Sequence, residues 1–225
     1  MTSRRAVALK RVNVGCGRTP TPGWVNFDNS WSVRLGQHPL LLRLVARSGL
    51  LGDAQLAFAQ EVRALGVRWA DATRLPLEDG SVELLYSSHM LEHLDRAEAR
   101  AFLGEVRRVL APGAIVRLAV PDISRLVSGY LRSGDADAFV ASTLLATSRP
   151  RGPVARLRAA VVGGRDHAWM YDGASLCQLL IANGFVDAQV LAAGETTIPL
   201  PAPLDLQERA DESVYVEARR DAHRS

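Results

Sequence analysis

Seven short apolar runs, rich in β-branched residues, alternate along the chain with segments whose apolar residues recur at helical spacing. Strands that alternate with helices build βαβ units, which place parallel strands side by side in one sheet. The last two runs are close in sequence, so the last strand is expected to be antiparallel. The predicted fold class is α/β, a seven-stranded, mostly parallel sheet with helices on both faces. The predicted strands are residues 11–14, 24–27, 67–70, 82–87, 114–120, 185–192 and 213–218.

Two of the helical segments carry clear start and stop signals. Asp95 followed by Glu98 fits a capping box, and Pro112-Gly113 is expected to stop that helix. Asp172 is the expected N-cap of the second helix, and Gly184 is its expected C′ residue.

Composition describes an ordinary globular chain. It has 225 residues, 48% of them hydrophobic and 23% charged, with a net charge of +3. That length suits one α/β domain, so a single domain over residues 1–225 is expected. No apolar run approaches the roughly 20 residues that a membrane span needs, and the basic start lacks the apolar core of a signal peptide. Cys16 and Cys177 lie in unrelated contexts, which argues against a disulfide and fits a reducing, cytoplasmic location.

Two stretches exceed a minimal alternation of strands and helices. Residues 31–66 and 122–165 both have amphipathic helical patterns, and insertions at the carboxyl side of such sheets usually build a substrate cover. A helical cover over the active site is therefore expected. The apolar stretch at 39–51 suits either a lid helix or a contact between two copies of the chain, and peripheral membrane contact stays open.

The second of these stretches is also the most basic part of the chain. Arginine forks suit phosphate or carboxylate groups, so an anionic or glycosylated small molecule fits, although a solvated helix face fits too. Aromatic residues do not interleave with these arginines, which disfavours nucleic acid. The arginines are Arg149, Arg151, Arg156, Arg158 and Arg165.

The first strand leads into a turn in which Gly15 and Gly17 flank Cys16, and Asp28 follows eleven positions after the second glycine. A glycine turn lets backbone approach a ligand closely because no Cβ intervenes. A carboxylate at the end of the next strand can accept both hydroxyl hydrogens of a ribose. The same residues also suit a plain strand-turn-strand with a capping aspartate, because short glycine motifs are weak signals.

Four stretches in this order resemble class I S-adenosylmethionine-dependent methyltransferases, in particular the methyltransferase type 11 group. They are "NVGCG" (13–17), "DATRLP" (71–76), "DGSVELLYSSHMLEHL" (79–94) and "RVLAPGAIVRLAVPD" (108–122), and the likeness resumes at 167–185. The resemblance implies a Rossmann-like sheet and S-adenosylmethionine as the methyl donor, with S-adenosylhomocysteine as the product.

At the first two strands the resemblance implies cofactor-binding roles. Gly15, Cys16 and Gly17 would line the methionine and ribose part of the cofactor, and Asp28 would bind the ribose hydroxyls. Only "RTPTPGW" separates the glycine turn from the second strand, too short for the helix that most of the superfamily has there. A compact subgroup, often found beside sugar-modifying enzymes, shares this form. Trp24 is then expected to pack beside the site or in the core.

At the third and fourth strands the resemblance implies the remaining contacts. Asp71 would accept a hydrogen bond from the adenine amino group, with the Ala72 backbone close by. Ser88 and His89 would lie under the sulfonium end, at the mouth of the acceptor pocket.

A hydroxyl acceptor benefits from a base, and histidine titrates near neutral pH. His167 and His89 are the candidate catalytic residues, and His93 is a weaker one because it lies at a helix start. His167 is expected to face the pocket with Tyr171 and Asp172. No acidic cluster is placed for magnesium and the cysteines lack clustered histidines, so no metal is expected.

Transfer of methyl to a hydroxyl of a sugar, glycoconjugate or secondary metabolite is the predicted function. A tRNA or other macromolecular acceptor is an alternative, and so is a methyltransferase fold used for other chemistry or as a non-catalytic partner. A dinucleotide oxidoreductase fits less well, because Pro20 replaces the third glycine of its fingerprint.

Overall fold

The computed structural model describes residues 9–48, 52–145, 152 and 166–223. All seven predicted strands are present, with boundaries shifted by a few residues. They are β1 (Lys10–Val14), β2 (Val25–Asp28), β3 (Val67–Trp69), β4 (Val82–Ser88), β5 (Leu110–Pro121), β6 (Phe185–Leu191) and β7 (Ser213–Arg220).

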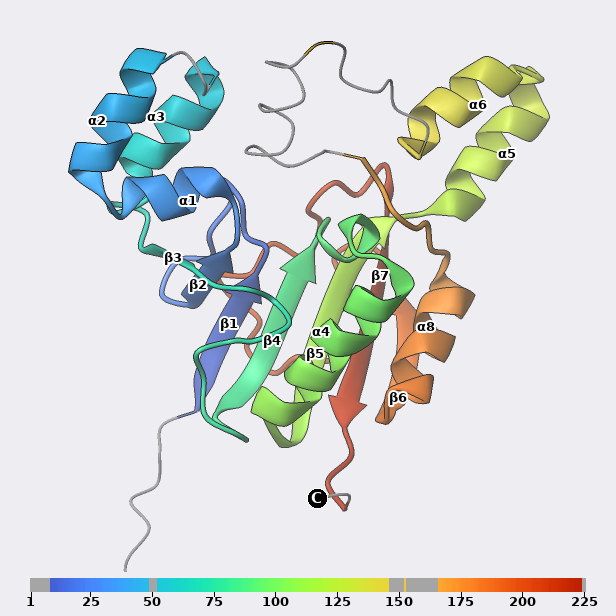
Figure 1. Ribbon diagram of the computed structural model, residues 1–225. Helices are drawn as coiled ribbons and strands as arrows, with labels where there is room; N and C mark the ends of the chain where they lie inside the picture. The colour runs from blue at the N-terminus through green and yellow to red at the C-terminus, as the bar shows by residue number, and fades with distance from the viewer. Residues whose placement is uncertain (1–8, 49–51, 146–151, 153–165, 224–225) are drawn as a thin grey trace, which may run out of the picture.

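The strands form one sheet in the order β3-β2-β1-β4-β5-β7-β6 (Figure 1). The first five in sequence are parallel, and β7 runs antiparallel to both β5 and β6. The predicted antiparallel last strand is confirmed. The parallel strands end at one edge of the sheet, called the carboxyl edge below, where ligands bind in open α/β folds.

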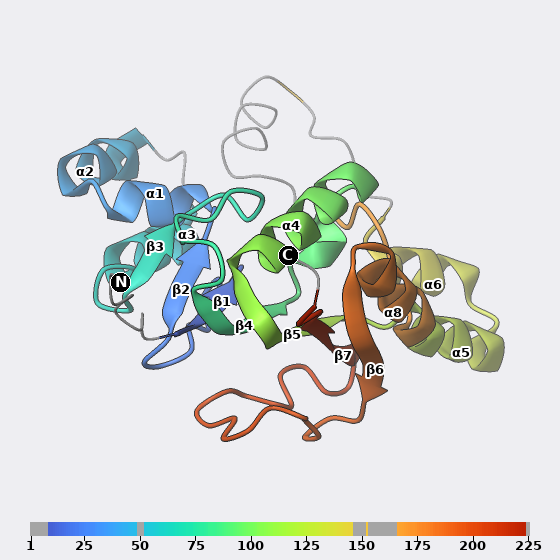
Figure 2. The ribbon, with the colours of Figure 1, turned by 90° about the horizontal axis from the view of Figure 1, so that it is seen from below.

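Helices α4 (Arg96–Val109) and α8 (Gly173–Ala182) cover one face of the sheet, as Figure 2 shows from below. Asp95 and Glu98 form the predicted capping box, and Asp172 caps α8 as expected. Phe102 and Val106 of α4 and Leu176 of α8 are completely buried in the core that these helices share with the strands. Helix α4 ends at Val109, before the predicted stop at Pro112, because Leu110 already pairs with Val82 in the sheet.

The centre of the opposite face differs from the expected helical layer. Trp24, Leu84 and Tyr86 pack there against Ile198 and Leu204, which belong to the irregular segment between β6 and β7. Alternate residues of β4 and β5 point to opposite faces, so this second core needs its own cover. An irregular segment therefore takes the place of a helix over this part of the sheet, and Trp24 is a core residue of that face.

The two predicted insertions contain helices near the carboxyl edge, on either side of it in Figure 1. The first contains α1 (Trp31–Gly36), α2 (Pro39–Ser48) and α3 (Asp53–Glu61). The second contains α5 (Ile123–Ser133) and α6 (Ala136–Thr143). The arginines at 149, 151, 156, 158 and 165 lie outside the described residues. None of the described helices has the length and apolarity to cross a bilayer.

A buried ion pair ties the second face together. Arg117 of β5 and Glu217 of β7 are 0% and 1% exposed, and Nη1 of the arginine lies 2.6 Å from Oε1 of the glutamate. The hydroxyls of Thr196 and Thr197 donate to the same carboxylate. Arg117 also donates to the carbonyl oxygens of Glu195 and Leu206. The pair thus anchors the irregular segment to the sheet.

Glu217→Gln should lower the free energy of unfolding by about 3 kcal/mol, because it leaves a buried guanidinium without its counter-charge. Urea unfolding followed by circular dichroism measures this. Glu83→Gln is the matched control, since Glu83 pairs with Arg11 at 41% and 26% side-chain exposure. The control should lose less than about 1 kcal/mol. Equal losses in the two variants would contradict the role given to the buried pair.

The same pair predicts part of the acid sensitivity of the fold. Burial alone would raise the pKa of Glu217, but hydrogen bonds from Thr196, Thr197 and Arg117 outweigh it and hold the pKa below its ordinary value. A depressed folded-state pKa contributes stability above the unfolded pKa of about 4.3, and this stability is lost as pH falls through the folded pKa. Glu217→Gln should therefore flatten the stability curve on its acid side.

Candidate functional site at the carboxyl edge

The glycine turn after β1 has the left-handed backbone that its sequence predicts. Gly15 and Gly17 have φ of 74° and 49°. The amides of Gly15 and Cys16 both donate to the carbonyl oxygen of Phe27, at 2.8 and 3.1 Å. A Cβ at Gly15 would lie 2.5 Å from the side chain of Met90. The missing side chain therefore makes room for Met90, a neighbour that the sequence analysis does not identify.

Two buried asparagines hold the compact connection between β1 and β2. Asn26 accepts a hydrogen bond from the Thr21 amide at 2.8 Å and donates to the carbonyl oxygens of Thr21 and Trp24. Asn13 donates to the Thr21 hydroxyl at 3.0 Å. These bonds satisfy backbone groups that a helix would otherwise pair, which explains how so short a loop can join two parallel strands.

Asp28 ends β2 beside the glycine turn. Its Oδ2 accepts from the Gly17 amide at 3.1 Å and its Oδ1 accepts from the Ser30 amide at 2.8 Å. Each carboxylate oxygen has two lone pairs, so both can accept a further hydrogen bond from a ligand. The structure thus brings Gly17 and Asp28 together at the position the resemblance implies.

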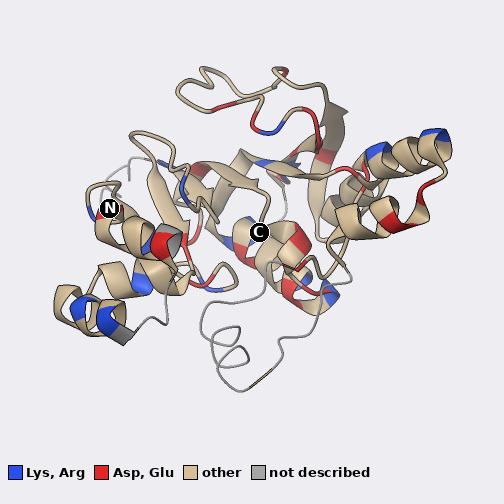
Figure 3. Ribbon diagram, turned by 90° about the horizontal axis from the view of Figure 1, so that it is seen from above, with Lys and Arg blue, Asp and Glu red and all other residues tan. Residues whose placement is uncertain are grey.

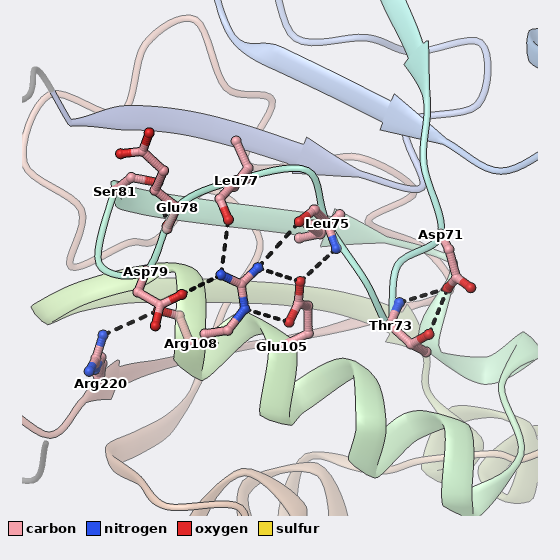
Figure 4. Close-up of polar contacts among 10 residues, drawn as sticks. All are labelled: Asp71, Thr73, Leu75, Leu77, Glu78, Asp79, Ser81, Glu105, Arg108 and Arg220. Atoms are coloured by element: carbon pink, nitrogen blue, oxygen red, sulfur yellow. Dashed lines mark hydrogen bonds and ion pairs between the residues drawn. The ribbon is translucent and has the colours of Figure 1, made fainter.

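Asp71 begins the turn that follows β3. Its Oδ1 accepts from both the amide and the hydroxyl of Thr73 at 2.8 Å, which leaves its exposed Oδ2 toward solvent (Figure 4). A groove of about 450 Å³ opens beside this turn. Its lining residues are Asn29, Asp71, Ala72, Thr73, Leu94, Ala97, Glu98 and Ala101.

Helix α4 fixes the chain that carries this turn. The Arg108 guanidinium binds both carboxylate oxygens of Glu105 and donates to the carbonyl oxygens of Leu75 and Leu77 (Figure 4). Glu105 in turn accepts from the Leu75 amide at 2.6 Å. Bidentate pairs of this kind are directional, so one side of the groove is held rigidly against the helix.

The end of β4 carries buried hydroxyls. Ser87 and Ser88 are 2% and 9% exposed, and within the described residues their Oγ atoms have no hydrogen-bond partner. Buried polar groups are almost always paired in folded proteins. Unpaired hydroxyls beneath the glycine turn are therefore a signal of a ligand-binding position.

His89 follows directly, with a left-handed φ of 48° that a non-glycine residue rarely adopts. Its Nδ1 lies 3.0 Å from Nη1 of Arg209, and its Nε2 lies 2.8 Å from Oγ of Ser213. Arginine can only donate, so Nδ1 accepts and Nε2 carries the proton. The lone pair of His89 is thus engaged, which disfavours it as a base in this arrangement.

The segment between β6 and β7 also reaches the site, through residues that the sequence analysis does not single out. Glu208 accepts hydrogen bonds from the hydroxyls of Tyr86 and Thr19, at 2.8 and 3.2 Å. Arg209 is the partner of His89. No local motif marks these residues, because they lie more than a hundred positions away from the strands they contact.

His167 is buried, and its Nδ1 lies 2.8 Å from the carbonyl oxygen of Thr143. Its ring lies near that of His93, with centroids 5.2 Å apart. Burial lowers the pKa of His167 below its ordinary value, despite the opposing charge of Glu92. Tyr171 is buried in the core and Asp172 caps α8, so the expected grouping of His167 with these two residues is not observed.

Cys16 is a packing residue in this structure. It is 4% exposed and lies in a cluster with Val33, Phe58 and Val62, which joins the glycine turn to α1 and α3. Burial and the nearby Asp28 raise the pKa of its thiol to about 12. The thiol is therefore protonated at neutral pH, which excludes a nucleophilic role there.

Comparison with known proteins gives the site its family context. A family model described as a methyltransferase domain matches residues 48–118. The resemblance to the methyltransferase type 11 group is confirmed. An uncharacterized 37.1 kDa protein of a Streptomyces fradiae transposon is 38% identical over 72 residues. These residues make up 32% of this chain and 20% of that protein, so the chain matches only a fifth of its curated relative.

Solved structures show what fold this chain has. One is an S-adenosylmethionine-dependent methyltransferase of Thermotoga maritima, described as a possible histamine N-methyltransferase. Its TM-score is 0.53 at 16% sequence identity, and the match covers 94% of this chain and 82% of that one. One from Mesorhizobium loti has a TM-score of 0.47 and 19% identity, covering 95% and 91%. The predicted Rossmann-like methyltransferase fold is confirmed.

Gly15→Ala should destabilise the protein more than Gly17→Ala. Both positions have positive φ, so each alanine costs about 1 kcal/mol or more in backbone strain. Only the Cβ at position 15 also meets Met90, whereas the Cβ at position 17 has open space around it. Thermal unfolding of the two variants measures the difference. An equal loss in both would mean that Met90 moves aside without cost.

Proposed function

We propose that this chain transfers a methyl group from S-adenosylmethionine to a hydroxyl group of a small-molecule acceptor. The acceptor is a sugar, a glycoconjugate or a secondary metabolite. One observation carries the proposal. The glycine turn, Asp28 and the groove at Asp71 lie at the carboxyl ends of three adjacent strands, β1, β2 and β3. A ligand with a polar sugar and a flat base matches that row of features.

The residues of the chain fit such a cofactor. Asp28 would accept the ribose hydroxyls with the lone pairs that Gly17 and Ser30 leave free. Asp71 and the Ala72 backbone would border the adenine in the groove. The unpaired hydroxyl of Ser88 would turn toward the sulfonium end.

S-adenosylmethionine supplies a methyl group that is already activated by the positive charge on sulfur. The chain must align the acceptor oxygen, exclude water and accept a proton. Asp28 orients the ribose and Asp71 the adenine, and the Arg108–Glu105 pair supports the chain beside the groove. The helices of the two insertions are suited to shield the carboxyl edge (Figure 1).

His167 is the proposed base that takes the proton from the hydroxyl group of the methyl acceptor. Its Nδ1–H donates to Thr143, which leaves the lone pair on Nε2. Its lowered pKa keeps the ring neutral, and so able to take a proton, at physiological pH. His89 is the second candidate, and it could act only after its Nδ1 parts from Arg209.

A macromolecular acceptor such as tRNA is the second candidate function. Seen from above the carboxyl edge, the blue Lys and Arg positions and the red Asp and Glu positions are interspersed along the ribbon of the described residues (Figure 3). Nucleic-acid binding usually needs a basic stripe. This distribution supports a small molecule over an RNA acceptor.

Calorimetric titration with S-adenosylmethionine and S-adenosylhomocysteine should give micromolar dissociation constants, and NAD should not bind. Asp28→Ala should weaken binding at least about tenfold, because it removes charge-assisted hydrogen bonds to the ribose. Asp221→Ala is the matched control, since Asp221 follows β7 at the opposite edge of the sheet. Unchanged affinity in Asp28→Ala would refute the proposed cofactor site.

His167→Ala should lower kcat by about 100-fold or more on a hydroxyl acceptor, a loss typical of a missing general base. Radiolabelled methyl transfer to the acceptor measures it. The wild-type rate should rise with pH through a pKa below about 6.5 and then level off. His38→Ala, which changes an exposed histidine of the first insertion, is the control. Full turnover by His167→Ala would rule out this base.

A further inference from the structure

Glu92 is an unusual carboxylate. It follows β4 in the short helix η1 (Leu91–His93), and it is 1% exposed. Among the described residues, neither of its carboxylate oxygens has a hydrogen-bond partner. A buried carboxylate that accepts no hydrogen bond is strongly unfavourable. Its position therefore calls for a cation within reach.

Two histidines supply lone pairs at this place. Nε2 of His93 lies 3.9 Å from Oε1 of Glu92. Each of three residues, Glu92, His93 and His167, offers one atom that can bind a metal, and these three atoms lie within 4.8 Å of one another. Glu92 and His93 belong to η1, and His167 belongs to the chain that leads into α8. Glu92 and His167 are buried.

The other ring nitrogens of these histidines already have acceptors. His93 Nδ1 lies 3.0 Å from the carbonyl oxygen of Asp166, and His167 Nδ1 lies 2.8 Å from that of Thr143. A carbonyl only accepts, so each Nδ1 carries the proton and each Nε2 carries the lone pair. Histidines that bind metals are commonly oriented in this way, with the second nitrogen donating to a backbone carbonyl.

We propose that Glu92, His93 and His167 bind one divalent transition-metal ion of the zinc class. A donor set of two imidazoles and one carboxylate suits zinc and its neighbours better than magnesium or calcium, which prefer oxygen ligands. In a tetrahedral zinc site the donor atoms lie about 3.3 Å apart, so small side-chain rotations would close the site. His93 is 36% exposed and gives the ion a route from solvent.

Three protein ligands leave a coordination position for water or for an oxygen of the acceptor, as in catalytic zinc sites. The sequence between Leu145 and Asp166 contains no histidine, cysteine, aspartate or glutamate to fill that position. Nδ1 of His89 lies 3.5 Å from Oε1 of Glu92, but its lone pair accepts a hydrogen bond from Arg209 at 3.0 Å, so His89 is not a ligand in this arrangement.

The metal would change the role of His167. When the ion is bound, the Nε2 lone pair of His167 cannot take a proton, so the role of base proposed above for the metal-free chain would pass to a metal-bound hydroxide, formed from a water whose pKa falls to about 7 on zinc. The ion would also join η1 to the chain entering α8, where the amides of Ala168 and Trp169 already donate to the Glu92 carbonyl. Metal binding can be tested apart from the proposed methyl transfer, since it requires neither cofactor nor acceptor.

Elemental analysis of the tag-free full-length protein should find close to one zinc-class ion per chain. After removal of metal by a chelator, cobalt(II) should bind with the visible absorption bands of a tetrahedral site. Zinc should raise the Tm of the metal-free protein. These measurements need no activity, so they stand or fall apart from the proposed function, which calorimetry with S-adenosylmethionine tests separately.

Glu92→Gln, His93→Ala and His167→Ala should each weaken cobalt binding at least about tenfold, the loss expected when a coordinating group is removed. His38→Ala and His89→Ala should keep it. His93 is partly exposed, so its variant should fold even if His167→Ala does not, and circular dichroism checks this. Stoichiometric binding that survives in all three ligand variants would overturn the site. So would the absence of any bound ion together with an unchanged Tm in zinc.

Discussion

The buried pair of Arg117 and Glu217 is the interaction on which the far side of the sheet depends. It joins β5 to β7, and its spare hydrogen bonds hold the segment between β6 and β7 against the strands. That segment then carries Glu208 and Arg209 to the carboxyl edge, where they contact Tyr86 and His89. A structural ion pair on one face of the sheet therefore influences polar contacts at the proposed site. Such a pair is tolerated in the core because both oxygens of Glu217 and both terminal nitrogens of Arg117 make hydrogen bonds.

The connection between β1 and β2 shows how the fold dispenses with an element. Asn13 and Asn26 pair the backbone and the hydroxyl of Thr21, so no helix is needed to satisfy this loop. The glycine turn then lacks the positive helix terminus that often supports nucleotide binding. In the proposed site, cofactor binding would therefore depend more on direct hydrogen bonds, above all those of Asp28. The helices α1 and α3 pack against Cys16 and stabilise the turn from outside.

Polar groups without partners gather at the end of β4. The hydroxyls of Ser87 and Ser88 and the carboxylate of Glu92 are all buried, and within the described part of the chain they lack hydrogen bonds. His89 nearby has a strained backbone. Unpaired buried polar groups and strained backbone of this kind are typical of functional sites. The proposed cofactor and the proposed metal ion would satisfy different members of this group.

The sequence alone determined the seven strands, the antiparallel last strand, the capped helices and the place of Gly15, Gly17, Asp28 and Asp71 at the ends of their strands. These are local properties, set by apolar periodicity, capping residues and turn chemistry. Only the tertiary structure decided that Met90 fills the space above Gly15, that Glu208 and Arg209 reach the site, and that Glu92, His93 and His167 come together. The physical reason is that these contacts join residues that are remote in sequence or lie in irregular segments. Their positions follow from the packing of the whole sheet, which no local pattern records.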